Sequence, residues 1–209
     1  MMITMEIFNC FLIAMSFLGL LVFVALYFVK AGYGVFRTRS WGISIPNKTA
    51  WVLMEAPVFF VLFYLWITSE NPFSIPVLIF FLLFELLYSG GWHYFVSPHA
   101  ILGMLLFFLG MGINLHSDYV IRNLRQPGDT RHYLPTRGMF KYVTSANYLG
   151  ELIEWIGFAL LTISPAAGVF VWWTFANLVP RAHAIHQHYR KEFGTVAVGK
   201  RKRIIPFIY

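Results

Sequence analysis

Polar side chains recur at helical spacing directly after one of the most apolar runs of the chain. The run covers 101–113, and Asn114, Asp118, Arg122 and Arg125 follow it on one face of a continued helix. Ionisable groups at membrane depth are costly, so they usually face the interior of a helical bundle, where they pair, bind a ligand or react. These four residues, the first polar stripe, are therefore candidate site residues.

A second polar stripe lies in the next segment of helix length. Asn147, Glu151 and Glu154 recur at helical spacing along 148–163, a stretch that is otherwise apolar enough to lie in lipid. The same cost of burying ionisable groups applies to these residues. The second stripe therefore provides further candidates, and the helices that carry both stripes must turn them into the interior of a bundle.

The composition indicates that these helices lie in lipid. Of the 209 residues 58% are hydrophobic, 19% are aromatic and only 12% are charged, which is more apolar than a soluble core requires. Apolar stretches, most of them near the roughly twenty residues of a spanning helix, cover 7–29, 50–68, 72–88, 100–115, 148–163 and 166–179. We expect an all-α fold, a polytopic membrane helical bundle of about six apolar segments, as a single domain, 1–209.

The first apolar stretch, 7–29, is too long for the core of a signal peptide and has no basic residue before it. We therefore expect it to be a retained first span. Cys10 lies within this stretch and is the single cysteine of the chain, which excludes an internal disulfide bond.

Positive charge is confined to three segments. The net charge is +7, and all 16 Lys and Arg residues fall within 30–48, 122–141 and 181–203. This distribution argues against nucleic acid as a partner, because basic segments beside spans mark the cytoplasmic side of a membrane. A basic face there suits anionic lipid headgroups or a phosphorylated cofactor. We expect the basic loops and tail to face the cytoplasm of a bacterial inner membrane or of the endoplasmic reticulum.

The charge distribution and the number of apolar stretches disagree. The positive-inside rule places the loop at Glu70 outside the cytoplasm and Arg122 on the cytoplasmic side, so the chain must cross the membrane an odd number of times between them. The sequence offers two apolar stretches there. About forty residues cannot make three full crossings at a rise of ~1.5 Å per residue. Either one stretch is re-entrant or a span is missing; the alternative is that one basic loop departs from the rule.

Five segments of the chain, taken in order, resemble the steroid 5α-reductase family. They read LGMGINLHSD (109–118), RNLRQPGD (122–129), GMFKYVTSANYLGE (138–151), EWIG (154–157) and IPFIY (205–209). The segments 32–34 and 51–57 support the match near the start of the chain. Several motifs in a fixed order are far more specific than any single motif.

The resemblance implies an integral membrane oxidoreductase that uses NADPH to reduce the C4=C5 double bond of a 3-oxo-Δ4-steroid or a similar lipid enone. In that family the nicotinamide lies among the helices, the phosphates lie toward the cytoplasm, and the lipid substrate enters from the bilayer. The resemblance further implies N-terminal helices, 1–100, that serve the substrate, and C-terminal helices, 101–209, that bind the cofactor.

Two residues of the N-terminal part are the candidates for catalysis. Hydride attack on an enone moves negative charge onto the carbonyl oxygen, which a hydrogen-bond donor in a dry pocket must meet. Glu55 lies mid-segment, where lack of water keeps its carboxyl protonated. It matches the family glutamate that faces the substrate carbonyl, and Tyr88 matches a tyrosine on the next helix. The structural alternatives are a hydrogen bond to a neighbouring helix for Glu55 and an interfacial anchor for Tyr88.

A larger set of residues is the candidate for binding the cofactor. Amides and carboxylates suit ribose hydroxyls and a carboxamide, and guanidinium groups suit phosphates. The two stripes supply Asn114, Asp118, Arg125, Asn147 and Glu151. The resemblance adds Trp51, Tyr142, Arg181, His186, Tyr189 and Arg201, with Arg37 for the 2′-phosphate. For Arg122 we favour an ion pair with Asp118, and Glu154 is either a supporting partner or part of the packing.

The sequence departs from the family pattern, chiefly in its middle region. Met54 replaces the glutamine that usually precedes the catalytic glutamate, and after Tyr88 the family's His-Arg segment and the following span are absent. This is also where the charge rule lacks one crossing. His132 and Tyr133 stand where the family more often has a tyrosine and then a basic residue. We therefore expect a shortened member of the family.

Other functions stay open on the sequence. A membrane methyltransferase of the isoprenylcysteine or phospholipid type has a similar pattern near Gly150 and Glu151 but binds S-adenosylmethionine. A polyprenol or enoyl-CoA reductase differs mainly in substrate shape, and a non-catalytic remnant would bind cofactor or lipid without turnover. A metal oxygenase is disfavoured, because His183, His186 and His188 form one group, whereas di-iron enzymes need several groups on different helices.

Overall fold

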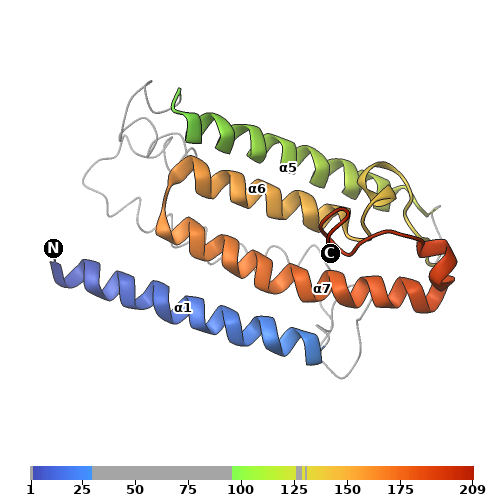
Figure 1. Ribbon diagram of the computed structural model, residues 1–209, viewed down its shortest axis with the longest axis horizontal. Coiled ribbons are helices and arrows are strands. Elements are labelled where there is room, and N and C mark those ends of the chain that lie inside the picture. The colour runs from blue at the N-terminus through green and yellow to red at the C-terminus, as the bar shows by residue number, and fades with distance from the viewer. Residues whose placement is uncertain (1, 30–95, 126–128, 130) are drawn as a thin grey trace. The chain divides into compact units, whose positions relative to one another are not determined.

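The computed structural model describes residues 2–29, 96–125, 129 and 131–209. Contacts group Met1–Ala31 and Pro98–Tyr209 into one compact unit; of the second unit, Gly32–Ser97, the described part is 96–97. In chain order the helices of the first unit are α1 (Met2–Phe28), α5 (Pro98–Arg122), the short 3-10 helix η4 (Gly138–Lys141), α6 (Ala146–Thr162) and α7 (Pro165–Val198) (Figure 1).

Regular structure in the described residues is helical, which confirms the expected all-α class. The exception is an isolated parallel bridge between Val143 and Lys202. Two of the described helices are long and apolar enough to cross a membrane, over Glu6–Phe28 and Pro98–Arg122. The expected spans at 50–68 and 72–88 lie outside the described residues, so the number of six segments stays a prediction.

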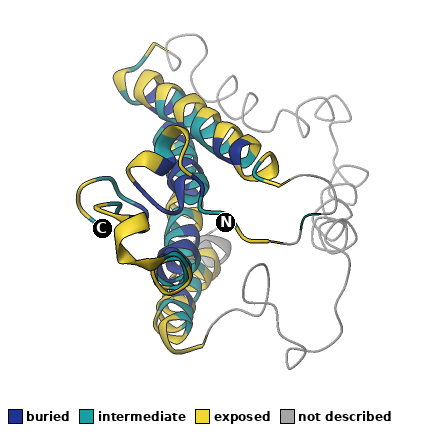
Figure 2. Cartoon of the chain, turned by 90° about the vertical axis from the view of Figure 1, so that its right-hand side faces the viewer, coloured by how far each residue is buried: buried dark blue, intermediate teal, exposed yellow. Residues whose placement is uncertain are grey.

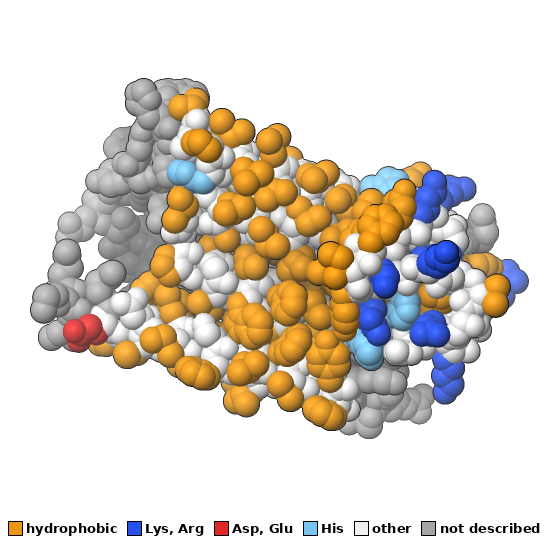
Figure 3. All heavy atoms as spheres, viewed as in Figure 1, with side chains coloured by type: hydrophobic (Ala, Val, Ile, Leu, Met, Phe, Trp, Pro, Cys, Tyr) orange, Lys and Arg blue, Asp and Glu red, His pale blue; other side chains and the backbone are white. Residues whose placement is uncertain are grey.

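Hydrophobic side chains cover the outer faces of the described helices. On α1 the side chains of Phe17 and Leu21 are each 66% exposed, and on α5 that of Leu105 is 62% exposed. Figure 3 shows this hydrophobic surface and, at one end of the helices, a gathering of Lys and Arg side chains. An apolar exterior that ends in a basic face is typical of helices embedded in a membrane, and it supports a membrane location for the chain.

Four glycines bring α5 and α6 into backbone contact. A Cβ atom built at Gly103 would lie 2.8 Å from the carbonyl oxygen of Gly157, and one at Gly110 would lie 2.6 Å from that of Gly150. A helix residue with a side chain cannot make so close an approach, so small residues are typical of such interfaces in membranes. The pairing makes the two helices antiparallel and fixes which residues of α5 lie against which residues of α6.

A tight turn connects α6 to α7. Ile163 ends α6 in a left-handed conformation (φ 46°), Ser164 is extended, and Pro165 then begins α7, where its missing N–H costs nothing. α7 is interrupted near its end by Gly194, whose φ of 83° glycine adopts without strain. The apolar stretches 148–163 and 166–179 thus correspond to α6 and to the first half of α7.

α1 runs parallel to α7 and is held to it by two tryptophans. The indole Nε1 of Trp172 donates to the carbonyl oxygen of Ser16 at 3.0 Å, and that of Trp173 donates to Met15 at 3.0 Å. Gly19 leaves room for this contact, because a Cβ atom there would lie 2.6 Å from Nε1 of Trp172. Lipid offers an indole N–H no acceptor, so both groups find one in the neighbouring helix.

The buried core lies where η4 and the C-terminal segment pack against α5, α6 and α7. It consists of Val120, Phe140, Val143, Ala146, Leu149, Leu152, Leu178, Val179, Ala182 and Ile204. The C-terminal segment is fixed by backbone hydrogen bonds: the N–H of Thr144 donates to Lys202, and the N–H of Lys202 donates to Tyr142, both at 2.9 Å. Figure 2 shows buried residues on the inner sides of the helices and exposed residues on their outer sides.

Candidate functional site

The contact between α5 and α6 places the two polar stripes against each other. A Cβ atom at Gly150 would lie 2.5 Å from the backbone nitrogen of Asn114, and one at Gly110 would lie 2.3 Å from that of Glu154. The stripe side chains that are half-buried are Asn114, Asp118, Asn147, Glu151 and Glu154. The structure therefore brings together most of the stripe residues that the sequence spacing singled out.

Glu151 lies at the centre of the electrostatic contacts between the stripes. The charges of Glu154, Arg181 and Asp118 all act on its carboxylate. Arg181 comes from α7, and its guanidinium carbon lies 5.7 Å from the ring centroid of Tyr148, a cation–π geometry. Three helices thus contribute to one polar region, whose carboxylates, amides and guanidinium group are suited to hold hydroxyl and carboxamide groups.

The outer part of the first polar stripe is a surface ion pair. Nη2 of Arg122 lies 4.0 Å from the carboxylate of Asp118, and the two side chains are 81% and 42% exposed. An ion pair this long and this exposed contributes about 1 kcal/mol at most. The geometry agrees with the interpretation favoured from the sequence, in which Arg122 is part of a helix ion pair.

Arg125 lies three residues beyond the end of α5, near a loop with its own hydrogen-bond network. Asp129 accepts bonds from Nε and Nη2 of Arg131, both at 3.1 Å, and from the hydroxyl of Tyr133 at 2.7 Å. These bonds lower the pKa of the Asp129 carboxyl to about 2, and those from Arg131 have the largest effect. The charge of the exposed Arg125 acts on Asp129 and Tyr133 and also on Tyr189 of α7. The loop therefore lies near two predicted cofactor residues, Arg125 and Tyr189.

His186 is buried on α7, beyond the apolar stretch of that helix. Its Nδ1 lies 3.2 Å from the hydroxyl oxygen of Thr144, within hydrogen-bond distance. Burial, together with the smaller effects of the charges of Arg203, Arg190 and His183, lowers the pKa of His186 to about 4. The imidazole is therefore neutral at physiological pH, although it is surrounded by basic side chains.

Two neighbouring cavities open at this basic end of the described helices. The first, of about 300 Å³, is lined by His186, Arg190, Gly199, Lys200, Arg201, Lys202 and Arg203. The second, of about 320 Å³, is lined by Lys141, Tyr142, Ala197, Val198, Gly199, Lys200, Arg201 and Phe207. Three predicted cofactor residues, Tyr142, His186 and Arg201, therefore line adjoining cavities rich in Lys and Arg. Such surroundings favour a phosphorylated ligand.

Arg201 also has a structural task. Its Nη1 donates to the carbonyl oxygen of Pro135 at 3.0 Å, and its Nη2 donates to that of Ala197 at 3.1 Å. These bonds join the loop after α5, the end of α7 and the C-terminal segment. Arg203 nearby packs its guanidinium 4.5 Å above the ring of Tyr209. The C-terminal segment 199–209 thus holds the lining of the basic cavities in place and also contributes positive charge to it.

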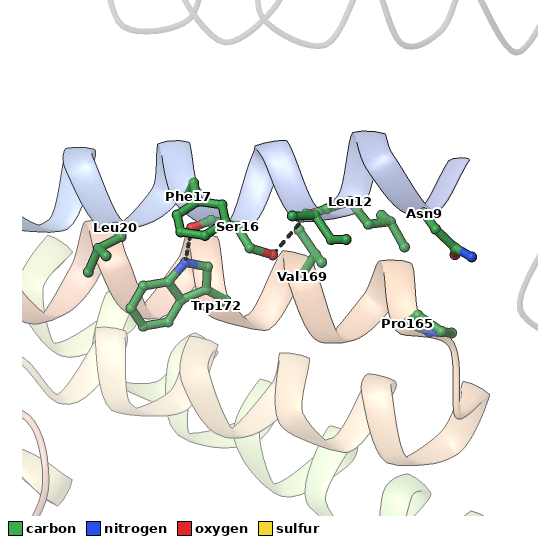
Figure 4. A pocket seen from close by; sticks show the side chains of 9 residues that line it. Asn9, Leu12, Ser16, Phe17, Leu20, Pro165, Val169 and Trp172 are labelled. Carbon is green, nitrogen blue, oxygen red and sulfur yellow. Dashed lines mark hydrogen bonds between the residues drawn. The ribbon is translucent and has the colours of Figure 1, made fainter. Parts of the chain in front are cut away.

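An apolar cavity of about 660 Å³ lies between α1 and α7, away from the polar region. Its lining consists of Asn9, Leu12, Ile13, Ser16, Phe17, Leu20, Pro165, Val169 and Trp172 (Figure 4). Among the described residues, the predicted site residues do not line it. Its lining is suited to a hydrocarbon chain or ring system. Two polar groups of the lining already have partners within the protein: the indole N–H of Trp172 donates to the carbonyl oxygen of Ser16, and the hydroxyl of Ser16 donates to that of Leu12.

Several residues of the site were not predicted from the sequence. Thr144, Lys202 and Arg203 contact His186 or line its cavity, and Asp129 organises the loop near Arg125. The alternation of Asp129 with Arg131 and Tyr133 is a signal that could have identified the loop network. Among the candidates, Glu55, Tyr88, Trp51 and Arg37 lie outside the described residues.

Comparison with known proteins bears on this arrangement. The family described as 3-oxo-5-alpha-steroid 4-dehydrogenase matches residues 79–209. The chain is 32% identical over 241 positions to 3-oxo-5-alpha-steroid 4-dehydrogenase 1 of Mus musculus, covering 92% of this chain and 93% of that protein. It is 34% identical over 235 positions to 3-oxo-5-alpha-steroid 4-dehydrogenase 2 of Sus scrofa, covering 89% and 91%. It is 29% identical over 252 positions to steroid 5-alpha-reductase DET2 of Gossypium hirsutum, covering 97% and 98%.

These three alignments are longer than the chain of 209 residues. Each relative therefore has residues within the aligned part that have no counterpart in this chain. This agrees with the shortened sequence expected from the motif pattern.

Proposed function

Because the chain belongs to the 3-oxo-5-alpha-steroid 4-dehydrogenase family, we propose that it reduces the C4=C5 double bond of a 3-oxo-Δ4-steroid or of a similar lipid enone, with NADPH as the reductant. The observation that carries the proposal beyond the family is the backbone contact of α5 with α6, which sets the polar stripes against each other. It gives an apolar bundle a polar interior region that adjoins a basic end.

The polar stripes form the nicotinamide and ribose part of the proposed cofactor site. Asn114 and Asn147 offer amide donors and acceptors for the carboxamide, and the carboxylates of Asp118 and Glu151 accept hydrogen bonds from ribose hydroxyls. Arg181 balances the charge of the Glu151 region. Because these side chains are half-buried between α5 and α6, bulk water competes less for such bonds than it would at a fully exposed surface.

The basic end forms the phosphate part of the proposed site. The cavities lined by Tyr142, His186 and Arg201 are rich in Lys and Arg side chains, and Arg125 and Tyr189 lie beside the neighbouring loop. We assign Arg37 and Trp51 to the same cofactor, on the family resemblance. Guanidinium groups hold phosphate oxygens in a bidentate geometry, whereas a neutral His186 donates or accepts a hydrogen bond without adding charge.

Glu55 and Tyr88 serve the substrate in the proposed reaction. NADPH supplies the hydride that reaches the β-carbon of the enone. The protonated carboxyl of Glu55 and the hydroxyl of Tyr88 donate hydrogen bonds to the carbonyl oxygen, where negative charge accumulates. A dry pocket strengthens both bonds and keeps Glu55 protonated. Hydride addition at the β-carbon leaves an enolate that the two donors stabilise, and a proton taken up from solvent at the α-carbon completes the saturated ketone and leaves oxidised cofactor. The steroid enters laterally from the bilayer, for which the hydrophobic exterior of the helices offers the route.

We assign the basic loops and the tail to the cytoplasmic side, on the positive-inside rule. The proposed enzyme is a single integral domain, 1–209, with about six apolar membrane segments. Either one of these segments is re-entrant, or a span of the middle region is missing, or one basic loop departs from the positive-inside rule. α5 runs without a break from Pro98 to Arg122, which is long enough for a complete crossing.

An activity measurement tests the proposal. Full-length protein in liposomes is incubated with NADPH and a panel of 3-oxo-Δ4-steroids, and NADPH oxidation is compared between the parent, Glu55→Gln and the control Glu6→Gln, which alters an exposed glutamate of α1. We expect steroid-dependent oxidation that falls about 10²–10⁴-fold in Glu55→Gln and is unchanged in Glu6→Gln. NADPH binding without oxidation would indicate a non-catalytic remnant. Protection from thermal unfolding by S-adenosylmethionine instead of NADPH would indicate a methyltransferase.

A further inference from the structure

Three side chains from α7 and from the loop that follows α5 lie close together. Oε1 of Glu192 lies 2.8 Å from Nδ1 of His132, and Oε2 of Glu192 lies 2.9 Å from Nε2 of His188. All the ligand atoms of these three residues lie within 4.8 Å of one another. The group is distinct from the proposed cofactor residues and takes no part in the proposed reduction.

The three residues come from two separate elements. His188 and Glu192 are one helical turn apart on α7 and therefore share a face of that helix. His132 lies on the loop, 60 residues before Glu192 in sequence. Its ring centroid is 6.1 Å from that of His188. The loop contributes one ligand atom and the helix contributes two, so an ion bound here would join the two elements.

Two imidazoles and a carboxylate form a donor set typical of zinc. Zn²⁺ binds such ligands at about 2.0–2.2 Å and is often held by three protein groups with water in the fourth position. Tetrahedral coordination at these lengths requires ligand atoms roughly 3.3 Å apart. The carboxylate oxygens of Glu192 lie 2.8 and 2.9 Å from their histidine nitrogens, and the ligand atoms of the three residues lie within 4.8 Å of one another. Side-chain rotations must therefore bring the two imidazoles closer together around an ion and away from the two carboxylate oxygens that they now contact. His132 and Glu192 are exposed, so an ion can enter from solvent.

We propose that His132, His188 and Glu192 bind a divalent transition-metal ion of the Zn²⁺ class, which fastens the loop to α7. Arg201 already ties the same loop to the tail through the carbonyl oxygen of Pro135. A metal ion would add a second attachment of this loop, to α7. Its binding would stabilise the folded loop without supplying a group to the reduction.

Metal titration of the full-length protein in detergent tests the site. The purification tag is removed, and Cys10→Ser serves as the background because a free thiol also binds Zn²⁺. Zn²⁺ is titrated in competition with a chromophoric chelator, with neither NADPH nor steroid present, so the result does not depend on the proposed activity. We expect one Zn²⁺ per chain. His132→Gln and Glu192→Gln should each weaken binding by about tenfold or more.

The control variant is His116→Gln, which removes a histidine outside the cluster on α5 and should leave Zn²⁺ affinity unchanged. Two further readouts separate loss of ligands from loss of fold. Zn²⁺ should raise the Tm of the background protein but not that of His132→Gln, and Co²⁺ should give the visible absorption of a tetrahedral site in the background alone. Absence of Zn²⁺ binding, or binding that survives both His132→Gln and Glu192→Gln, would overturn the proposal.

Discussion

A single methyl group added at Gly150 tests whether the contact of α5 with α6 positions the polar stripes. The Cβ atom of Gly150→Ala would lie 2.5 Å from the backbone nitrogen of Asn114 and 2.7 Å from the carbonyl oxygen of Gly110. Ordinary contacts of a Cβ atom begin at 3.4 Å. Both obstructing atoms belong to a helix backbone, so no side-chain rotation relieves the clash, and the helices must move apart by about 1 Å.

The magnitude follows from two opposing effects. Overpacking of this kind typically costs about 1–3 kcal/mol, whereas replacing glycine by alanine within a helix gains ~1 kcal/mol. The net change in stability is therefore a loss of up to about 2 kcal/mol. The functional effect should be larger, because a displacement of about 1 Å between positioned groups can reduce a reaction rate by about 10²-fold. NADPH affinity should fall as Asn114 and Asp118 move away from Asn147 and Glu151.

The matched control is Gly112→Ala on the same helix, because a Cβ atom at Gly112 has no heavy atom within 4 Å. This variant should be as stable as the parent or more stable by up to ~1 kcal/mol. The assay measures Tm in detergent and the NADPH dissociation constant for the parent and both variants. Equal Tm and equal NADPH affinity for Gly150→Ala and Gly112→Ala would refute the role given to the glycine contact.

Three further predictions concern the basic end and the contact of α1 with α7. Arg201→Gln removes two charge-assisted bonds to backbone carbonyls and should lower stability by about 2 kcal/mol, measured as a lower Tm, even without cofactor. The pKa of His186 is lowered from 6.5 to about 4, so the unfolded chain takes up a proton that the folded chain does not, and stability should fall by up to about 3 kcal/mol as the pH drops from about 6.5 to about 4. His186→Gln should flatten the Tm profile between about pH 4 and 6.5 and leave the pH dependence of Tm unchanged above pH ~7. Trp172→Phe removes the indole bond to α1 and should lower Tm by the equivalent of about 1 kcal/mol, whereas an unchanged Tm would show that α1 is held by packing alone.

Spacing predicted the polar stripes because helical periodicity is a local property. Asn147, Glu151 and Glu154 fall on one face of any helix that contains them, and the structure places this helix at Ala146–Thr162, close to the apolar stretch 148–163. Hydropathy located the lipid-facing part of α7 but not its end. That helix continues through His186 and Arg190 to Val198, because polar residues extend a helix as well as apolar ones do.

The partners of the stripes were beyond local reasoning. The pairing of Gly110 with Gly150 joins residues of two different helices, and a single sequence records each glycine without its partner. The basic cavities have the same origin, since Arg201 reaches Pro135 across 66 residues. The family resemblance named Tyr142, His186 and Arg201 among the candidate cofactor residues, and the structure places them around adjoining cavities. A resemblance carries tertiary information that spacing lacks.

Transfer of an isotopic label tests the central claim most directly. Protein in liposomes is incubated with NADPH carrying deuterium at the transferring position of the nicotinamide and with a 3-oxo-Δ4-steroid, and the product is analysed by mass spectrometry. The proposed chemistry predicts a saturated ketone with a single deuterium on the former β-carbon, and a strongly reduced yield from Gly150→Ala. A bound but unreacted steroid with fully retained label in the cofactor, or label that exchanges into water without saturation, would contradict the claim.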